Sequence, residues 1–451
     1  MQRNHTMAAF PPDVAALIAG LADRGTFTQL RLVSRGWDAA CRQAVQVPPF
    51  TLTEKSAPML PKFTPREMMV RCGDPDLLGR LAGFVGLRKL AVRGALLHVE
   101  ALAALTALTH LDLFGLPISD ARPLSGLAAV ETIHLDNTAL TDASPLARLT
   151  GLRHLYLGNT RVKNAAPLAH LTALRSLELG GTPVVDVAPL APLVGLRKLD
   201  LSYTKVADVH PLAGLIALRD LWLSYTYVAD VSVLASLTCL SRLDLGNTEV
   251  ADVCALTSLT ALRTLDLGNT KVADVRALTS LTALRVLDLG WTDVREVSTL
   301  SALTALEALN LGATAVLDWR TLSSLTALSS LELQQNSIAD LSHLADLTAL
   351  RNLSLGKTAV SDVGPLAGLT ALRKLSLQDT AVADVRPLSG LTALRELSLQ
   401  DTVVADVSPL SGLTNLRDLH LSGSPVSDVG PLSALQSLRI SGVSDSDNED
   451  C

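Results

Sequence analysis

Aromatic side chains are scarce in this 451-residue chain: they make up 3% of it, although 48% of its residues are hydrophobic. Any core must therefore be built from aliphatic side chains, here mostly leucine, valine and alanine. No apolar run approaches the roughly 20 residues that a membrane-spanning helix needs. With so many hydrophobic residues and only 18% charged ones, the composition excludes a chain that is disordered throughout.

An excess of basic charge and paired cysteines are also missing. The formal net charge is −6, which gives no general attraction to nucleic acid or to an anionic membrane, so neither is expected as a partner. The five cysteines are odd in number and form no CxxC pair, which favours reduced thiols over a disulfide framework. The first twenty residues have no basic segment followed by an apolar core, as a secretory signal would. We therefore expect a cytoplasmic or nuclear protein.

Sequence signatures of catalysis and metal binding are absent as well. The nine histidines are scattered, and none has the HExxH spacing of a zinc site. No EF-hand, glycine-rich phosphate loop or nucleophile elbow is found. We therefore expect no catalytic residues, no metal site and no cofactor.

What the sequence does contain is a repeat of 22 residues. Leu152, Leu174 and Leu196 are 22 positions apart, and the series runs without a slip from Leu108 to Leu438. With this leucine as position 1, apolar residues recur at positions 1, 4, 6, 11, 14, 17 and 20. Such periods indicate an array, because one repeat alone buries too few side chains to offset the entropy cost of ordering its backbone.

Within each repeat the pattern predicts a short strand and a helical turn, as in the repeat that begins at Leu174. Positions 4 and 6 are buried and alternate with exposed positions, as in a strand with one buried face. Thr182, at position 9, turns the chain away from the strand. Asp186, at position 13, precedes the apolar pair Val187 and Leu190, which suits one turn of 3₁₀ or α helix capped by the aspartate.

The pattern LxxLxLxxTxVxDVxPLxxLTx resembles the short leucine-rich repeats of internalins and of the regulatory subunit of protein phosphatase one. The resemblance implies an α/β leucine-rich-repeat solenoid at residues 87–440, with about 16 repeats, a curved parallel sheet and short turns on its convex side. That family usually has asparagine at position 9, where its amide bonds backbone groups between repeats. Here threonine takes the position, with Asn336 the exception, so a ladder of threonine hydroxyls is expected to do the same work.

The N-terminal segment has apolar residues at helical spacing and resembles an F-box. The Leu-Pro-x-Glu-Ile start of that motif aligns with Phe10–Val14, and its VSRxW end aligns with Val33–Trp37. The resemblance implies an α-helical F-box-like segment at residues 1–45 that docks on a Skp-type adaptor of a cullin–RING ubiquitin ligase. The residues implied in adaptor binding are Pro11, Asp13, Val14, Ile18, Leu30, Val33 and Trp37.

An alternative for the N-terminal helices is a plain cap over the exposed apolar edge of the first repeat, which solenoids require. Residues 46–86 are rich in proline and are expected to form a connector and N-terminal cap. Residues 441–451 are acidic and are expected to form a disordered tail.

A ligand would meet the side chains at positions 3, 5, 7 and 8, which project from the concave side of the sheet. Position 2 is mostly arginine and position 5 is largely acidic. Columns of opposite sign reduce the repulsion between like charges stacked ~5 Å apart, so a structural role is expected for them, with a groove for a basic partner as the alternative. The acids of position 5 are Asp112, Glu178, Asp200, Asp244, Asp266, Asp288 and Glu332.

The few aromatic residues gather in one part of the array, since all four tyrosines lie between residues 156 and 227. Exposed aromatic side chains are enriched at binding hot spots, so these residues are predicted to form one patch that Trp291 extends. The alternative is neutral variation among recently duplicated repeats. The residues predicted to bind a protein substrate are Tyr156, Asp200, Tyr203, Trp222, Tyr225 and Trp291.

These observations lead us to expect a receptor without an active site of its own. Its concave face would bind a protein substrate, and its F-box-like segment would link that substrate to a cullin–RING ligase through a Skp-type adaptor. The alternative is an interaction scaffold independent of a ligase, such as a phosphatase regulator or a host-directed effector.

Overall fold

The structure, a computed structural model, describes residues 51–52, 67–72, 83–94 and 99–442. The predicted F-box-like segment, with the seven residues expected to bind an adaptor, lies outside these ranges, as does the predicted tail beyond residue 442. The chain divides into two compact units, Met1–Arg161 and Val162–Cys451. Within the described ranges, no helix has the length and apolar character needed to cross a membrane.

Each 22-residue repeat forms one short strand and one 3₁₀ turn, and every helical element in the described ranges is of the 3₁₀ type. The predicted core positions are buried in repeat after repeat. In one repeat of the second unit, the side chains with no exposed surface are Leu196, Leu199, Leu201, Val206, Val209, Leu212 and Leu215. These are positions 1, 4, 6, 11, 14, 17 and 20, so the core predicted from the period is confirmed.

In the first unit the strands pair in sequence order, and all pairs are parallel. Two of them, β1 and β2, fall within residues 46–86, where the sequence predicted a connector and cap. Strand β2 pairs with β3 over its whole length, from Glu67 opposite Lys89 to Cys72 opposite Gly94. The strands are β1 (Thr51–Leu52), β2 (Glu67–Cys72), β3 (Lys89–Gly94), β4 (His110–Asp112), β5 (Thr132–His134) and β6 (His154–Tyr156), and the 3₁₀ turns are η5 (Glu100–Ala104), η6 (Arg122–Leu124) and η7 (Ser144–Arg148).

The second unit continues the same design, with each strand parallel to the next and shifted by one repeat, as where Leu243 lies opposite Leu265. Its strands are β7 (Ser176–Glu178), β8 (Lys198–Asp200), β9 (Asp220–Trp222), β10 (Arg242–Asp244), β11 (Thr264–Asp266), β12 (Val286–Asp288), β13 (Ala308–Asn310), β14 (Ser330–Glu332), β15 (Asn352–Ser354), β16 (Lys374–Ser376), β17 (Glu396–Ser398), β18 (Asp418–His420) and β19 (Arg439–Ser441).

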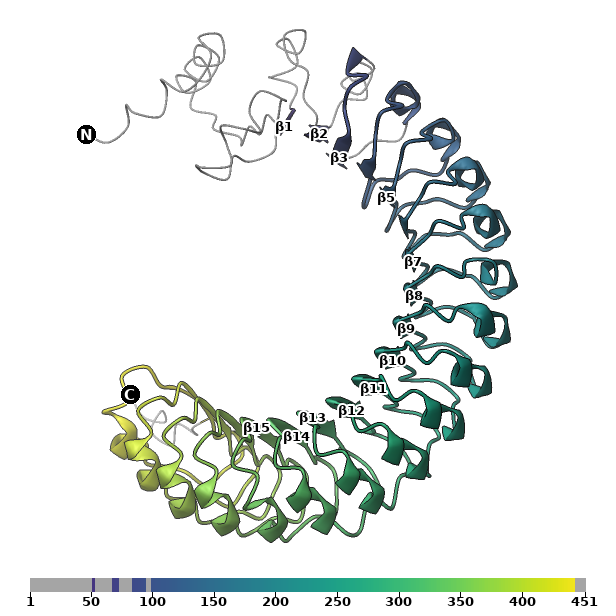
Figure 1. Cartoon of the computed structure of the whole chain (residues 1–451). Helices are drawn as coiled ribbons and strands as arrows, with labels where there is room; N and C mark the ends of the chain where they lie inside the picture. Colours follow the sequence, from purple (N-terminus) through teal and green to yellow (C-terminus); the bar gives the residue numbers. More distant parts are fainter. Residues whose placement is uncertain (1–50, 53–66, 73–82, 95–98, 443–451) are drawn as a thin grey trace, which may run out of the picture. The chain divides into compact units, whose positions relative to one another are not determined.

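The 3₁₀ turns of the second unit lie on the opposite side of the array from the strands, which line its inner, concave side (Figure 1). The turns are η8 (Ala166–His170), η9 (Ala188–Leu190), η10 (His210–Gly214), η11 (Ser232–Ser236), η12 (Cys254–Ser258), η13 (Arg276–Ser280), η14 (Ser298–Ala302), η15 (Arg320–Ser324), η16 (Ser342–Leu344), η17 (Gly364–Gly368), η18 (Arg386–Gly390), η19 (Ser408–Gly412) and η20 (Gly430–Leu432).

The aspartates at position 13 do cap the turns, but from one residue further out than predicted. The N-cap of η9 is Val187, and Asp186 stands just before it. The Oδ1 atom of Asp186 accepts a hydrogen bond from the backbone N–H of Ala188, the first residue of the turn, at 2.8 Å. This is an Asx turn, which satisfies one of the N–H groups that a helical turn leaves without a partner.

The threonines at position 9 differ from the expected ladder between repeats. The hydroxyl of Thr270 donates a hydrogen bond to the carbonyl oxygen of Leu267, three residues earlier in its own repeat, at 2.6 Å. A hydroxyl has one hydrogen to donate, and this bond uses it. Asn336 has two amide hydrogens and joins its own repeat to the preceding one, so the inter-repeat bond is made where asparagine is present.

Candidate functional site

Three aspartates form a row across neighbouring strands of the second unit. Asp244, Asp266 and Asp288 occupy position 5 of β10, β11 and β12, and each lies opposite the next in the parallel register. Strand spacing places their Cα atoms ~4.8 Å apart. We call these three residues the acidic row.

Backbone amides hold the carboxylates of the acidic row in place. The Oδ1 atom of each aspartate accepts a hydrogen bond from the N–H two residues further on, at 2.8 Å in the case of Asp266 and Gly268. Glycine at position 7 leaves space there, because a Cβ atom built on Gly268 would lie 3.0 Å from Oδ1 of Asp288. The glycine therefore makes room for the carboxylate of the next repeat.

The acidic row carries charge that the protein itself does not neutralise. No ion pair to Asp244, Asp266 or Asp288 is found in the described part of the chain. The pKa of Asp266 is raised to about 6, chiefly by burial and also by the negative charges of Asp288 and Asp244, against the opposing hydrogen bond from Gly268. The pKa of Asp244 is raised as well, first by burial and then by the neighbouring carboxylates.

Two arginines at position 2, Arg285 and Arg175, have other partners, whereas the sequence predicted that this column balances the acids of position 5. Arg285 pairs with Glu307, which also stands at position 2, one repeat further on. Arg175 donates to the carbonyl oxygen of Gly195 at 2.8 Å. Opposite charges thus meet within one column at the edge of the sheet, and the acidic row stays without a cation.

Two exposed tyrosines stack beside this row. The ring centroids of Tyr203 and Tyr225 are 4.3 Å apart, with an angle of 11° between the ring planes. Their exposed fractions are 62% and 49%. We call these two residues the tyrosine pair.

The tyrosine pair sits on an unusual backbone. Both residues have a φ of +56°, in the left-handed region. Position 8 has a positive φ throughout the described repeats, and many repeats place asparagine or glycine there, as at Asn247 and Gly181. Those two residue types tolerate this region best, whereas the left-handed conformation costs a residue with a bulky side chain roughly 1–2 kcal/mol.

The tyrosine pair and the acidic row share one surface. The pKa of Tyr203 is raised by desolvation first, then by Tyr225, and the negative charge of Asp244 adds to the shift. Trp222 lies opposite Asp244 on one side and opposite Asp200 on the other, in the register of β8, β9 and β10. The structure therefore brings together four of the predicted residues, Asp200, Tyr203, Trp222 and Tyr225.

The other two predicted residues are Tyr156 and Trp291. Tyr156 belongs to the first unit, where its ring stacks on His134 with centroids 4.0 Å apart, a partner that the sequence analysis missed. Trp291 is three repeats beyond Tyr225, and the positions between them are held by Asn247 and Asn269, whose side-chain amides are joined at 2.6 Å. Trp291 is nevertheless 51% exposed and belongs to the same repeat as Asp288, so it flanks the far end of the acidic row.

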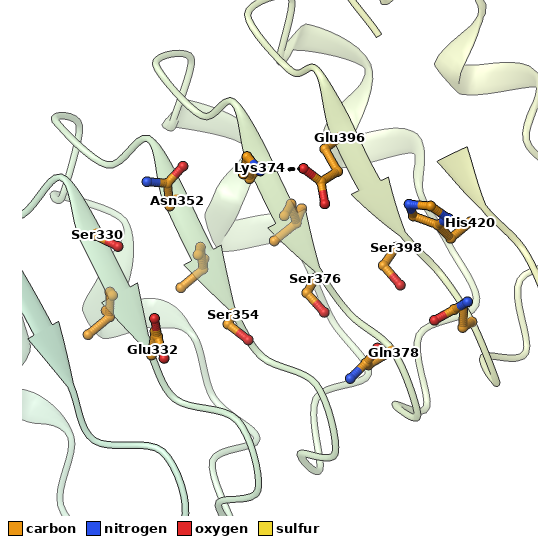
Figure 2. A pocket seen from close by; sticks show the side chains of 14 residues that line it. Ser330, Glu332, Asn352, Ser354, Lys374, Ser376, Gln378, Glu396, Ser398 and His420 are labelled. Carbon is orange, nitrogen blue, oxygen red and sulfur yellow. Dashed lines mark ion pairs between the residues drawn. The ribbon is translucent and has the colours of Figure 1, made fainter. Parts of the chain in front are cut away.

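A hollow on the strand face, towards the C-terminal end of the second unit, was not predicted. It is a polar pocket of about 380 Å³, in which Ser354, Ser376 and Ser398 replace the acids of position 5 on three successive strands (Figure 2). Lys374 and Glu396, at position 3, form an ion pair at 2.6 Å above them. The run of serines at position 5 is the signal in the sequence that could have found this pocket.

Other kinds of site are not indicated in the described ranges. No group of three or more histidine, cysteine, aspartate or glutamate side chains there is arranged to hold a metal ion. Cys239 and Cys254 are exposed and carry free thiols.

Comparison with known proteins gives one matching sequence family and several solved structures of similar fold. Residues 392–437 match the family described as leucine-rich repeats, two copies. No curated protein sequence matches the chain. Among solved structures, an internalin (InlF) of Listeria monocytogenes is 27% identical over 70% of this chain and 87% of its own, with a TM-score of 0.60.

Two more distant structures share the fold alone. A leucine-rich-repeat protein of Leptospira interrogans is 18% identical, covers 94% of this chain and 98% of its own, and has a TM-score of 0.60. The plant peptide hormone receptor RGFR1, in complex with RGF2, is 16% identical over 83% of this chain and 77% of its own, with a TM-score of 0.55.

Proposed function

Because this chain is a leucine-rich-repeat protein with internalins among its structural neighbours, we propose that it is a non-catalytic module that binds a partner protein on the strand face of its second unit. The observation that carries this proposal is the exposed, stacked tyrosine pair. Aromatic side chains of this kind dominate the binding energy of many interfaces, because they bury a large area and lose little conformational entropy.

The backbone beneath the tyrosine pair supports the same conclusion. Asparagine or glycine would fit the left-handed φ of position 8 at lower cost, yet Tyr203 and Tyr225 stand there in adjacent repeats. Tyrosine at this position lowers stability, although other repeats of the same array have residues that fit better. This favours a functional role for the two tyrosines. The fold is also that of the receptor RGFR1 in its complex with RGF2, which is compatible with a receptor role here.

The test is an affinity capture from the organism that encodes the chain, with identification of the bound proteins by quantitative mass spectrometry. The full chain is compared with Tyr203→Asn/Tyr225→Asn, which installs the residue that other repeats use at position 8. We expect a partner whose recovery falls by about tenfold with this variant, a loss typical of hot-spot removal. A matched control, Arg320→Gln on the outer turn η15, should recover it in full. If no captured protein depends on the tyrosine pair, the proposal is wrong.

We further propose that residues 1–45 link the chain to a cullin–RING ligase, which would make it a substrate receptor. The support for this is the sequence match of Phe10–Val14 and Val33–Trp37 to an F-box. The full chain is expected to capture a Skp-type adaptor, and Pro11→Ala/Val33→Asp is expected to lose it. If the adaptor is not captured, or if the double variant captures it equally, the chain is an interaction scaffold independent of a ligase.

A further inference from the structure

We propose that the surface formed by the tyrosine pair, the acidic row and Trp291 binds a positively charged, lysine- or arginine-containing segment of the partner protein. The inference rests on the proposed function and names the chemistry of the partner.

Aromatic side chains lie at both ends of the acidic row. The tyrosine pair precedes the acidic row by one repeat, and Trp291 stands on the repeat of Asp288 at its other end. From Tyr203 to Trp291 there are four repeats, or ~19 Å at the strand spacing. A polypeptide segment extended across the strands covers that distance with about six residues.

The charges facing this surface are predominantly negative. On strands β8 to β12, positions 3 and 5 carry five aspartates and two cations, Lys198 and Arg242. Lys198 pairs with Asp220 at 3.9 Å. One cation, Arg242, is then left on these positions for the other four carboxylates. A neutral or acidic segment would bury these carboxylates without compensation, at a cost that rises as water is excluded.

A cationic segment would interact favourably with both the aromatic rings and the carboxylates. Ammonium and guanidinium groups bind to the faces of tyrosine and tryptophan rings through the charge distribution of the ring. The same groups form charge-assisted hydrogen bonds with carboxylates, and arginine can bond a carboxylate with two parallel N–H groups. A segment with basic residues at alternate positions would direct them all to this face.

The polar pocket is less suited to a basic segment than this surface is. There the position-5 residues are serines, and Lys374 is already paired with Glu396. It offers neither a row of unpaired carboxylates nor a tyrosine or tryptophan ring, so a basic segment has no reason to prefer it.

The experiment measures binding of three matched, fluorescein-labelled peptides to the full chain by fluorescence anisotropy. The basic peptide alternates serine with lysine and arginine, the neutral peptide has glutamine in place of each basic residue, and the acidic peptide has glutamate. The variants are Tyr203→Asn/Tyr225→Asn and Asp244→Asn/Asp266→Asn. The control, Glu296→Gln/Asp346→Asn, makes the same charge change outside the strands.

The basic peptide should bind in preference to the other two, more weakly as salt is raised. Both test variants should lose about tenfold or more in affinity, and the control should stay within about twofold. Equal binding of the basic and neutral peptides, an equal loss in the control, or no loss in the tyrosine variant would overturn the inference. A captured partner that depends on the tyrosine pair but not on Asp244 and Asp266 would overturn it while the proposed function stands; if no capture depends on the tyrosine pair, both fail.

Discussion

The side-chain amide of Asn336 donates a hydrogen bond to the carbonyl oxygen of Leu311, one repeat earlier, at 2.7 Å. It also donates to Leu333 in its own repeat at 3.0 Å, and its oxygen accepts a hydrogen bond from the backbone N–H of Thr314 at 3.2 Å. Thr358, at the same position of the next repeat, bonds only within that repeat, to Leu355 at 2.6 Å. Asn336 therefore makes hydrogen bonds between repeats that Thr358 does not make.

Replacing Asn336 with threonine should lower the free energy of unfolding by about 1–2 kcal/mol, because the amide bonds to Leu311 and Thr314 in the preceding repeat are lost. Urea denaturation followed by circular dichroism measures the change. The reverse change, Thr358→Asn, should raise the stability by a smaller amount. If Asn336→Thr unfolds at the same urea concentration as the parent chain, the bond between repeats contributes nothing to stability.

The Asx turn of Asp186 gives a second prediction. Asp186→Ala should lower the free energy of unfolding by about 1 kcal/mol, because the N–H of Ala188 loses its acceptor. Asp186→Asn is the matched control, since Asn164 accepts the equivalent bond from Ala166 at 2.9 Å in another repeat. Thermal and urea unfolding should place the asparagine variant near the parent. An equal loss in both variants would show that the carboxylate acts through its charge.

The core of each repeat was predictable from the sequence, because the period of 22 is unbroken and each apolar position repeats with it. Leu199, Leu201 and Val206 are buried as their positions 4, 6 and 11 required. The tyrosine pair was predictable for the same reason, since residues at position 8 of adjacent repeats must be neighbours.

Other features of the site depend on three-dimensional detail that a period does not carry. The sequence shows columns of arginine and aspartate, but only the coordinates show that Arg285 turns to Glu307 and leaves the acidic row unpaired. The left-handed φ of Trp291 is hidden as well, because its position accepts several residue types. The stack of the Tyr156 ring on His134, within the first unit, is another contact that the period does not show.

The left-handed backbone predicts a stability effect at Trp291. Trp291→Asn should raise the free energy of unfolding by about 1 kcal/mol, because a φ of +55° costs asparagine less than it costs tryptophan. The corresponding gain for Tyr203→Asn should be smaller, because the stack with Tyr225 is lost at the same time. Urea titrations of both variants check the order. A loss of stability in Trp291→Asn would show that the indole ring packs well enough to outweigh the backbone strain.

The acidic row predicts how stability depends on pH. The pKa of Asp266 is about 6 in the folded chain and near 3.8 when it is free, so folding favours the protonated form. The resulting contribution to stability is fully present below pH 4 and is lost as the pH rises through about 6. Asp266→Asn should therefore be more stable than the parent at pH 7 and equal to it below pH 4. The gain should be about 1 kcal/mol, less than the pKa shift alone implies, because water still reaches the carboxylate and screens its charge.

Asparagine is a suitable replacement because Asn310 already occupies position 5 two strands further on. There its Oδ1 atom accepts a hydrogen bond from the N–H of Gly312 at 2.9 Å, as the carboxylate of Asp266 does from Gly268. The substitution thus removes the charge and keeps the bond. Urea unfolding of both chains between pH 4 and pH 8 gives the comparison, with Asp346→Asn as an exposed control. If the two stability curves stay parallel over that range, Asp266 is not the group that titrates, and the acidic row does not carry the repulsion assigned to it.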